Sequence, residues 1–186
     1  MKWLCVVCVL LVAGCGRSEP AAVAPDHAGH QTAQPVVGDN AFNPTDLAWL
    51  QLMIPMDEQL LRVLDLAARH TVDPELRRLA AGTANDRRAE LARLKALRAK
   101  AKAPTANQHA GHDMPGMMTE PEVVALSNTR GAAFDRLFAK NLREHAELSI
   151  VVAKSVATAG KHPEVKSLAA SIVETRTAQL TLLPPK

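Results

Sequence analysis

The chain has 186 residues, of which 3% are aromatic, and contains no tyrosine. A chain of this length can form one domain with a buried core, and its abundance of alanine and leucine with few aromatic residues favours packed helices over sheets. The formal net charge of +3 is small. Because basic and acidic residues are also interleaved along the chain, a nucleic-acid partner is not expected.

The N-terminus has the pattern of a bacterial lipoprotein signal. Lys2 precedes an apolar run from Trp3 to Ala13, which is too short to span a bilayer as a mature helix, and small residues then lead to Cys15. This arrangement resembles a lipobox and predicts removal of residues 1–14 and lipidation of Cys15. The expected location is the cell envelope, facing the periplasm, and the outer membrane is favoured because Gly16 follows the cysteine. An ordinary signal peptide with an incidental cysteine is the alternative.

Loss of the signal also limits the chemistry of the mature protein. Cys5 and Cys8 leave with the signal and Cys15 carries lipid, so no thiol remains for disulfides, zinc ligation or nucleophilic catalysis. The sequence has no Gly-x-Ser-x-Gly, no His-Glu-x-x-His and no Glu-x-x-His, which excludes the usual hydrolase, zincin and di-iron patterns. We therefore expect no enzymatic activity.

A flexible tether and two helical hairpins are predicted along the mature chain. Residues 15–41 are rich in Ala, Pro, Gly and Gln and show no apolar period. Asn43 and Asp73 are each followed by proline, the pattern of a helix N-cap with Pro at the first helical position, and apolar residues then recur at helical spacing. Thr119 and Glu122 resemble a capping box that opens a short extra helix, and His162-Pro163 begins the last helix. The predicted segments are a first hairpin at residues 42–102, a His/Met-rich linker at 103–118 and a second hairpin at 119–183.

An internal repeat relates the two hairpins. When Pro74 is placed on Pro163, apolar positions of one hairpin fall on apolar positions of the other. Because neither hairpin can bury its apolar stripe alone, the repeat predicts an all-α four-helix bundle over residues 42–183. The corresponding pairs are Trp49 with Phe138, Met56 with His145, Glu58 with Glu147, Leu79 with Leu168, Arg87 with Arg176, Leu91 with Leu180 and Leu94 with Leu183.

Several of these segments resemble the domain-of-unknown-function 305 family. They are Trp49-Leu-Gln-Leu-Met-Ile-Pro55, Asp73-Pro-Glu-Leu-Arg-Arg-Leu-Ala80, Met114-Pro-Gly-Met-Met-Thr119 and Phe134-Asp-Arg-Leu-Phe138. The resemblance implies an exported bacterial helical bundle of the ferritin-like type. It also implies that copper or silver is the ligand to test, since some members bind these ions, and it implies no catalytic activity.

The sequence departs from the family at its hallmark, a pair of adjacent histidines in each hairpin. Met56 and Asp57 occupy the first pair of positions, and His145 and Ala146 the second. Arginine also replaces the family's glutamine on the second helix of each hairpin. Because Arg87 and Arg176 fall on apolar stripes, where an unpaired charge is costly, we hypothesise that they are buried and paired with carboxylates. The candidate partners are Asp57, Glu58 and Glu147.

The strongest metal candidates therefore lie in the linker. Imidazoles and thioethers are ligands that Cu(I) and Ag(I) favour, and the histidines also suit Cu(II). The linker candidates are His109, His112, Met114, Met117 and Met118, with His27 and His30 repeating the His-x-x-His spacing in the tether. Met53, Met56 and His145 are weaker candidates, because a lone Met or His on an apolar face is more often a core residue. His70 and His162 are expected at the surface.

Two functions follow from these observations. The first is a lipid-anchored protein that binds or buffers copper or silver ions in the periplasm without catalysis. The alternative is a metal-free bundle that serves as an interaction or structural module, with the family's metal site replaced by buried Arg–carboxylate pairs. The protein partner in that case is not indicated.

Overall fold

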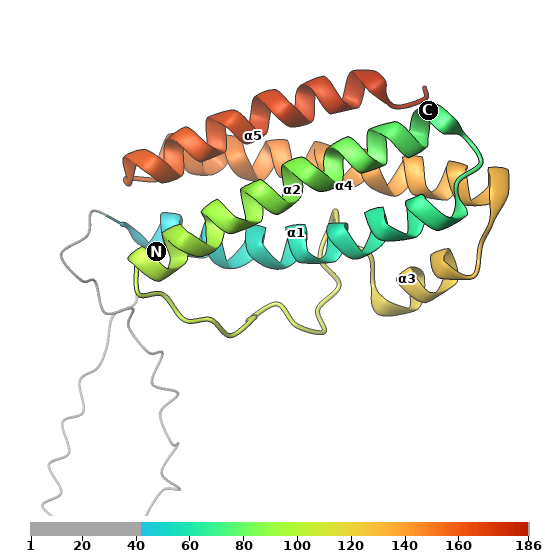
Figure 1. The fold of residues 1–186 in the computed structure, drawn as a ribbon. Helices are drawn as coiled ribbons and strands as arrows, with labels where there is room; N and C mark the ends of the chain where they lie inside the picture. Colours follow the sequence, from blue (N-terminus) through green and yellow to red (C-terminus); the bar gives the residue numbers. More distant parts are fainter. Residues whose placement is uncertain (1–41, 186) are drawn as a thin grey trace, which may run out of the picture. The chain divides into compact units, whose positions relative to one another are not determined.

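The computed structural model describes residues 42–185, which form helices and connecting loops without a strand in that range (Figure 1). The all-α class is confirmed; the ferritin-like label stays a prediction. The predicted signal and tether, with Cys15, His27 and His30, lie outside the described residues. Within the described part of the chain, no helix is both long and apolar enough to cross a membrane. The helices are α1 (Pro44–His70), α2 (Pro74–Lys100), α3 (Glu120–Ser127), α4 (Gly131–Ala159) and α5 (Pro163–Leu182).

Helices α1, α2 and α3 begin where capping chemistry predicts. The Asn43 side chain accepts a hydrogen bond from the Asp46 N–H, and the Asp46 carboxylate accepts one from the Asn43 N–H, at 2.9 and 2.8 Å. The Asp73 carboxylate accepts the N–H groups of the first turn of α2. Thr119 and Glu122 form the predicted capping box at the start of the short helix α3. These side chains satisfy backbone donors that have no partner within their own helix.

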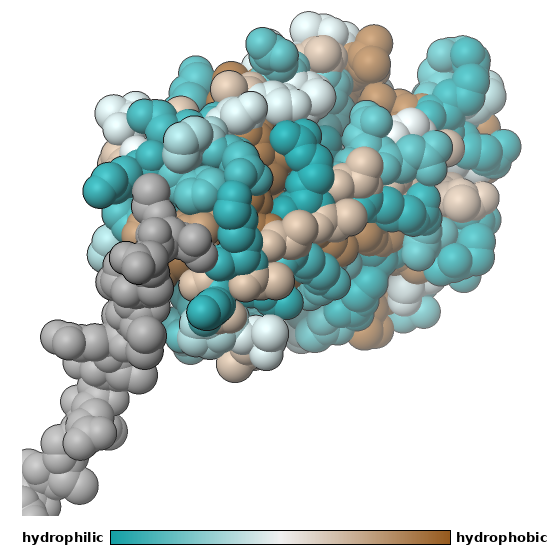
Figure 2. Space-filling view, turned by 60° about the vertical axis from the view of Figure 1, so that its left-hand side comes forward, coloured by the Kyte–Doolittle hydropathy of each residue, from teal (hydrophilic) through white to brown (hydrophobic). Residues whose placement is uncertain are grey.

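The four long helices pack against one another so that both hairpins share one interior. α1 packs on α2 and α4, and α5 packs on α4 and α2. Each of the two apolar core clusters takes residues from both hairpins, so each hairpin buries its apolar stripe against the other. On the face seen in Figure 2, the side chains are mostly hydrophilic, with hydrophobic strips between them. One cluster includes Trp49, Met53, Met56, Leu94, Val156 and Ile172, and the other Leu60, Leu76, Phe134, Phe138 and Leu142.

The repeat also sets up a reciprocal contact between the hairpins. Asp46 of α1 is fully buried and accepts the backbone N–H groups of Lys161 and His162, at 3.1 and 3.0 Å, in the loop between α4 and α5. Its repeat counterpart on α4, Asp135, accepts the Thr71 hydroxyl and the Asp73 N–H in the loop between α1 and α2. Each hairpin thus caps the turn of the other.

The expectation that His70 and His162 lie at the surface is wrong. His162 is buried and stacks on Phe42, with ring centroids 3.8 Å apart. His70 is also buried, and its ring meets the edge of Phe134. Both lie at hairpin turns, where periodicity indicates exposure. The reciprocal packing of the turns covers them instead.

Candidate functional site

The linker between the hairpins follows α1 through two tight turns (Figure 1). The His112 N–H donates to the His109 carbonyl, and the Met117 N–H donates to the Met114 carbonyl, at 3.1 and 3.0 Å. A glycine in the left-handed region lies in or next to each turn, with φ of 77° at Gly111 and 74° at Gly116. This conformation is strained for other residues, so the glycines allow the chain to fold back at these points.

Contacts with α1 hold the second half of the linker. Gln59 binds the backbone of Met118 twice, accepting its N–H at 2.8 Å and donating to its carbonyl. Arg62 pairs with Glu120 at 2.6 Å just beyond the linker. The side chains of Met117 and Met118 pack against the two apolar core clusters. The linker is therefore packed against the helices and is a structural element as well as a candidate site.

A surface pocket of about 570 Å³ lies between the linker and α1. Two histidines and two methionines of the linker are among the residues that line it, together with three acidic residues, and these are residue types that supply ligands to soft and borderline ions. Met114 is half-buried in the linker and is not among the lining residues. No group of three or more His, Cys, Asp or Glu side chains within residues 42–185 is already arranged to hold a metal ion. The lining residues that carry a donor group are His109, His112, Asp113, Met117, Met118, Glu58 and Glu120.

His145 lies on α4 and holds the linker from the other side. It is buried, and its Nδ1 lies 3.2 Å from the Gly116 carbonyl oxygen. Since a carbonyl only accepts, Nδ1 carries the proton, and the neutral ring leaves a lone pair on Nε2, which is buried without a partner. Burial, and secondarily the charge of Arg87, lower the pKa of His145 to about 4.

The weaker candidates Met53 and Met56 belong to the interior. Both are fully buried in the first apolar cluster, packed with Trp49 and other apolar residues. Their thioethers therefore stabilise the core by packing, and any metal-binding role would require them to leave it.

A charged cluster occupies the middle of the molecule. Arg87 and Arg176 are 1% and 0% exposed. Glu90 accepts from Arg87 at 2.7 Å and from Arg176 at 2.7 and 3.0 Å. Asp57 lies farther from them, 3.5 Å from Arg176 and 4.0 Å from Arg87. Both arginines are thus buried and paired, as hypothesised, and two fixed positive charges disfavour a cation in the interior.

The partners of these arginines were predicted only in part. Asp57 takes part, but Glu58 pairs with Lys95 at the surface at 2.7 Å, so its assignment is wrong. Glu147 is half-buried and lines a different pocket. Glu90 is a partner that the repeat does not indicate, because it lies on the same helix as Arg87. It lies three residues after Arg87 on the same helix, a spacing that places two side chains on one face.

Burial raises the pKa of both carboxylates in this cluster. It is the largest effect on Asp57, whose pKa rises to about 6, and on Glu90, whose pKa rises to about 9. The neighbouring Asp57 charge raises the pKa of Glu90 further, while Arg87 lowers both. The cluster therefore holds protons more tightly than exposed carboxylates do.

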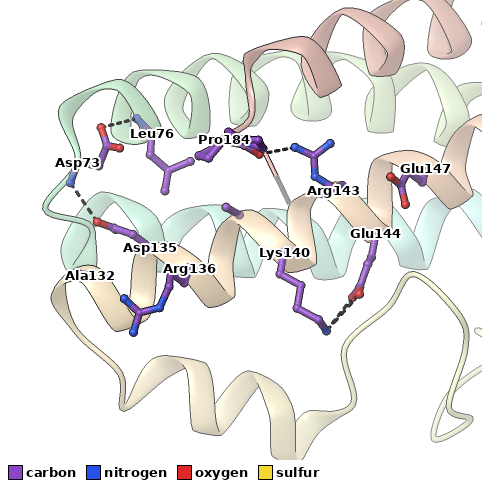
Figure 3. A pocket seen from close by; sticks show the side chains of 12 residues that line it. Asp73, Leu76, Ala132, Asp135, Arg136, Lys140, Arg143, Glu144, Glu147 and Pro184 are labelled. Carbon is purple, nitrogen blue, oxygen red and sulfur yellow. Dashed lines mark hydrogen bonds and ion pairs between the residues drawn. The ribbon is translucent and has the colours of Figure 1, made fainter.

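Another pocket, of about 710 Å³, lies between α4, the start of α2 and the C-terminal residues (Figure 3). Its charged side chains are partly engaged with neighbours: Lys140 pairs with Glu144 at 3.1 Å, and Arg143 donates to the Pro184 carbonyl. No His, Met or Cys lines it. It offers no ligand for a soft metal ion.

Fold and site together define an all-α protein of two repeated hairpins joined by a His/Met-rich linker. The chain belongs to the family described as Domain of unknown function (DUF305), which matches residues 46–184. The family resemblance predicted from the sequence is confirmed. A search of curated proteins gives no match.

Several solved structures have a similar fold. A putative secreted DUF305 protein from Streptomyces coelicolor has 22% identity and a TM-score of 0.68, covering 74% of this chain and 88% of its own. A DUF305 fragment from Deinococcus radiodurans has 21% identity and a TM-score of 0.67, with coverages of 76% and 94%. CopM in the Cu(II)-bound form has 24% identity and a TM-score of 0.64, with coverages of 73% and 90%. CopM structures in Cu(I)-bound and Ag-bound forms are also similar.

Proposed function

We propose that this protein binds or buffers copper or silver ions without catalysis, using the linker pocket. The observation that carries the proposal is the pocket itself, because one cavity is lined by His109, His112, Met117 and Met118. Two imidazoles and two thioethers are a donor set that Cu(I) and Ag(I) favour, and the histidines with a nearby carboxylate suit Cu(II). CopM, which shares the fold, has been crystallised with the same ions.

The linker is the favoured location over the interior. Metal binding in the core would place a cation near Arg87 and Arg176, with Met53 and Met56 already packed in the apolar cluster. The linker turns are held at Gly116 and Met118, whereas His112 is exposed and His109 half-buried. The two histidines can rotate without disturbing the core, whereas Met117 and Met118 must turn away from the core clusters to bind an ion.

We further propose that the protein acts at the cell envelope. The signal at residues 1–14 and the lipidation site Cys15 would anchor it to a membrane, with the outer membrane favoured, and leave the helical domain facing the periplasm. His27 and His30 on the tether would add a second pair of imidazoles for Cu(II). Mass spectrometry of the protein purified from a bacterial membrane tests this, since a diacylated N-terminal Cys15 is expected and an intact Met1 would contradict it.

A competition titration tests the binding function. The protein lacking residues up to Cys15 is titrated with Cu(I) against a chelator, and the experiment is repeated with the linker His and Met residues replaced. Loss of binding in the linker variant and retention in a Met56→Leu/His145→Asn variant support the proposal. Loss only in the second variant moves the site into the interior. Absence of binding tighter than that of a scrambled linker peptide removes the metal function.

The alternative is a metal-free interaction or structural module of the envelope. It is favoured by the buried cluster of Arg87, Arg176, Glu90 and Asp57, which stands where the resemblance places the family's metal site. This alternative predicts that copper leaves thermal stability unchanged in every variant, because nothing in the fold then binds the ion.

A further inference from the structure

One end of the helical domain is more basic than the rest of the described chain. It comprises residues 42–50, 95–102 and 152–170, which are the start of α1, the end of α2, the end of α4 and the start of α5 (Figure 1, left). An ion pair between Lys100 and Glu164 joins two of these segments. We call this surface the basic end. Its acidic residues are Asp46 and Glu164, and its basic residues are Lys95, Arg98, Lys100, Lys102, Lys154, Lys161 and Lys166.

Neighbouring acidic residues leave most of this positive charge unpaired. Asp46 is fully buried, where it accepts backbone N–H groups, and Glu164 is engaged by Lys100. Lys95 pairs with Glu58 of α1. The remaining basic residues form no salt bridge with any described residue, and all of them are exposed except the half-buried Arg98. They are Arg98, Lys102, Lys154, Lys161 and Lys166.

The opposite end has a mixed charge. It joins the end of α1 to the starts of α2 and α4, with α3 packed on α4. There Arg78 pairs with Glu75, and Arg62 pairs with Glu120. Basic and acidic residues are interleaved along the sequence, but folding separates them along the helices and concentrates unpaired positive charge at one end.

Helix electrostatics explain only part of this concentration. The C-terminus of a helix favours cations, which accounts for Arg98 and Lys102 at the end of α2. The N-terminus disfavours them, yet Lys161 directly precedes the N-cap His162 of α5. Lys166 closes the first turn of the same helix. These two lysines oppose the dipole of α5, so their charge indicates a partner outside the helix.

The basic end is also where the preceding chain joins the helical domain. Phe42, the first described residue, stacks on His162 in the loop between α4 and α5. The sequence predicts lipid on Cys15 and a flexible tether over residues 15–41, which would have a root-mean-square length of about 30 Å. The 27 residues of α1 place the opposite end about 40 Å farther away. A lipid on Cys15 would therefore keep the basic end nearer to the membrane.

We propose that the basic end docks on an anionic membrane surface. Each exposed lysine or arginine close to anionic headgroups strengthens such binding about fivefold. Docking in this way would stand the helices on end. Pro55, the first residue of α1 that lines the linker pocket, lies about 16 Å from the start of the helix, so the pocket stays open to solution. This inference rests on the proposed envelope location and adds the orientation of the domain.

Vesicle co-sedimentation tests the proposal. The protein lacking residues 1–15 keeps both core clusters and carries no lipid. We expect it to bind vesicles of phosphatidylglycerol and phosphatidylethanolamine, to release them as salt is added, and to leave phosphatidylcholine vesicles unbound. Lys161→Gln/Lys166→Gln should weaken binding at least about tenfold. The control Arg69→Gln/Arg136→Gln removes the same charge from exposed positions at the opposite end and should weaken it by about twofold at most.

Several outcomes would overturn the proposal. They are equal losses in the two double variants, equal binding to neutral vesicles, and absence of binding to anionic vesicles. Binding to polyglutamate but not to vesicles would instead identify an acidic polypeptide as the partner. Circular dichroism checks that each variant keeps its helices. Because the assay uses neither metal nor lipidated protein, its failure leaves the Cu(I) titration and the mass spectrometry of Cys15 to decide the proposed function.

Discussion

Replacing Glu90 with glutamine removes the carboxylate that holds the two buried arginines. Glu90 accepts hydrogen bonds of 2.7 to 3.0 Å from both guanidiniums, and its side chain is 8% exposed. Above the raised pKa of Glu90, which is about 9, glutamine keeps the shape and one acceptor but removes a negative charge. Asp57 is then the remaining carboxylate of the cluster, at 3.5 and 4.0 Å from the two arginines.

The expected cost is large. Removing one partner of a buried ion pair typically costs about 3–5 kcal/mol, because the other charge stays in the interior without compensation. A domain of this size is stable by about 5–15 kcal/mol, so the change removes a substantial part of that free energy. With a urea m value of about 2 kcal/mol/M, the unfolding midpoint falls by about 2 M.

Urea denaturation at a pH above the Glu90 pKa of about 9, followed by circular dichroism, measures this cost. Glu58→Gln is the control: Glu58 pairs with Lys95 at the surface, and such pairs contribute about 0–1 kcal/mol. Adding Gln179→Glu to Glu90→Gln returns a carboxylate at the repeat counterpart of Glu90, three residues after Arg176 on α5, and should recover about half of the lost free energy. A cost below about 1 kcal/mol for Glu90→Gln would refute the buried-charge reasoning.

Three other predictions concern the fold around the site. The pKa of His145 is about 4 in the folded protein and near 6.5 in the unfolded chain, so the unfolded chain takes up a proton first as the pH falls. The free energy of unfolding should therefore fall by about 2 kcal/mol between pH values above 6.5 and pH 5. Urea denaturation at several pH values should show that His145→Asn removes this decrease. Gly116→Ala should cost about 1–3 kcal/mol in thermal unfolding, because its φ is +74° and the new Cβ would lie 2.7 Å from a leucine of α4. Gly111→Ala, with open space around it, should cost less. Asp46→Ala should lower the free energy of unfolding by about 2–3 kcal/mol in urea denaturation, since three backbone N–H groups lose their acceptor. The control Asp65→Ala, at an exposed position, should change it very little.

Each of these predictions has a contradicting outcome. The raised pKa values of Asp57 and Glu90 make stability fall as the pH rises, opposite to the effect of His145, so the quantity to compare is the difference in unfolding free energy between wild type and variant at each pH. Parallel pH profiles would refute the His145 assignment. Equal losses of unfolding free energy in Gly116→Ala and Gly111→Ala would show that the linker is not tightly packed. A neutral Asp46→Ala would show that the reciprocal caps do not stabilise the fold.

The fold was predictable because the sequence repeats itself. The N-caps before Pro74 and Pro163 and the apolar spacing after them depend on local chemistry, and they locate the helices without reference to the rest of the molecule. The reciprocal capping by Asp46 and Asp135 was not predictable in this way. Both carboxylates contact the opposite hairpin, and His162 is buried for the same reason.

The candidate site was predictable in composition but not in arrangement. The linker histidines and methionines stand out by residue type alone, and the burial of Arg87 follows from its place on an apolar stripe. The role of Glu90 needed the packed structure, since a charged residue three positions from an arginine is usually a surface partner. The anchoring of the linker by Gln59 and His145 likewise depends on how the chain crosses the helices.

The most direct test of the metal-binding account is the Cu(I) affinity of the linker pocket measured by chelator competition. We expect the protein without its first 15 residues to bind Cu(I), and replacement of His109, His112, Met117 and Met118 by alanine or serine to weaken binding at least a hundredfold, about 2.7 kcal/mol. Unchanged affinity in that variant, or no affinity above that of a scrambled linker peptide in the wild type, would contradict it.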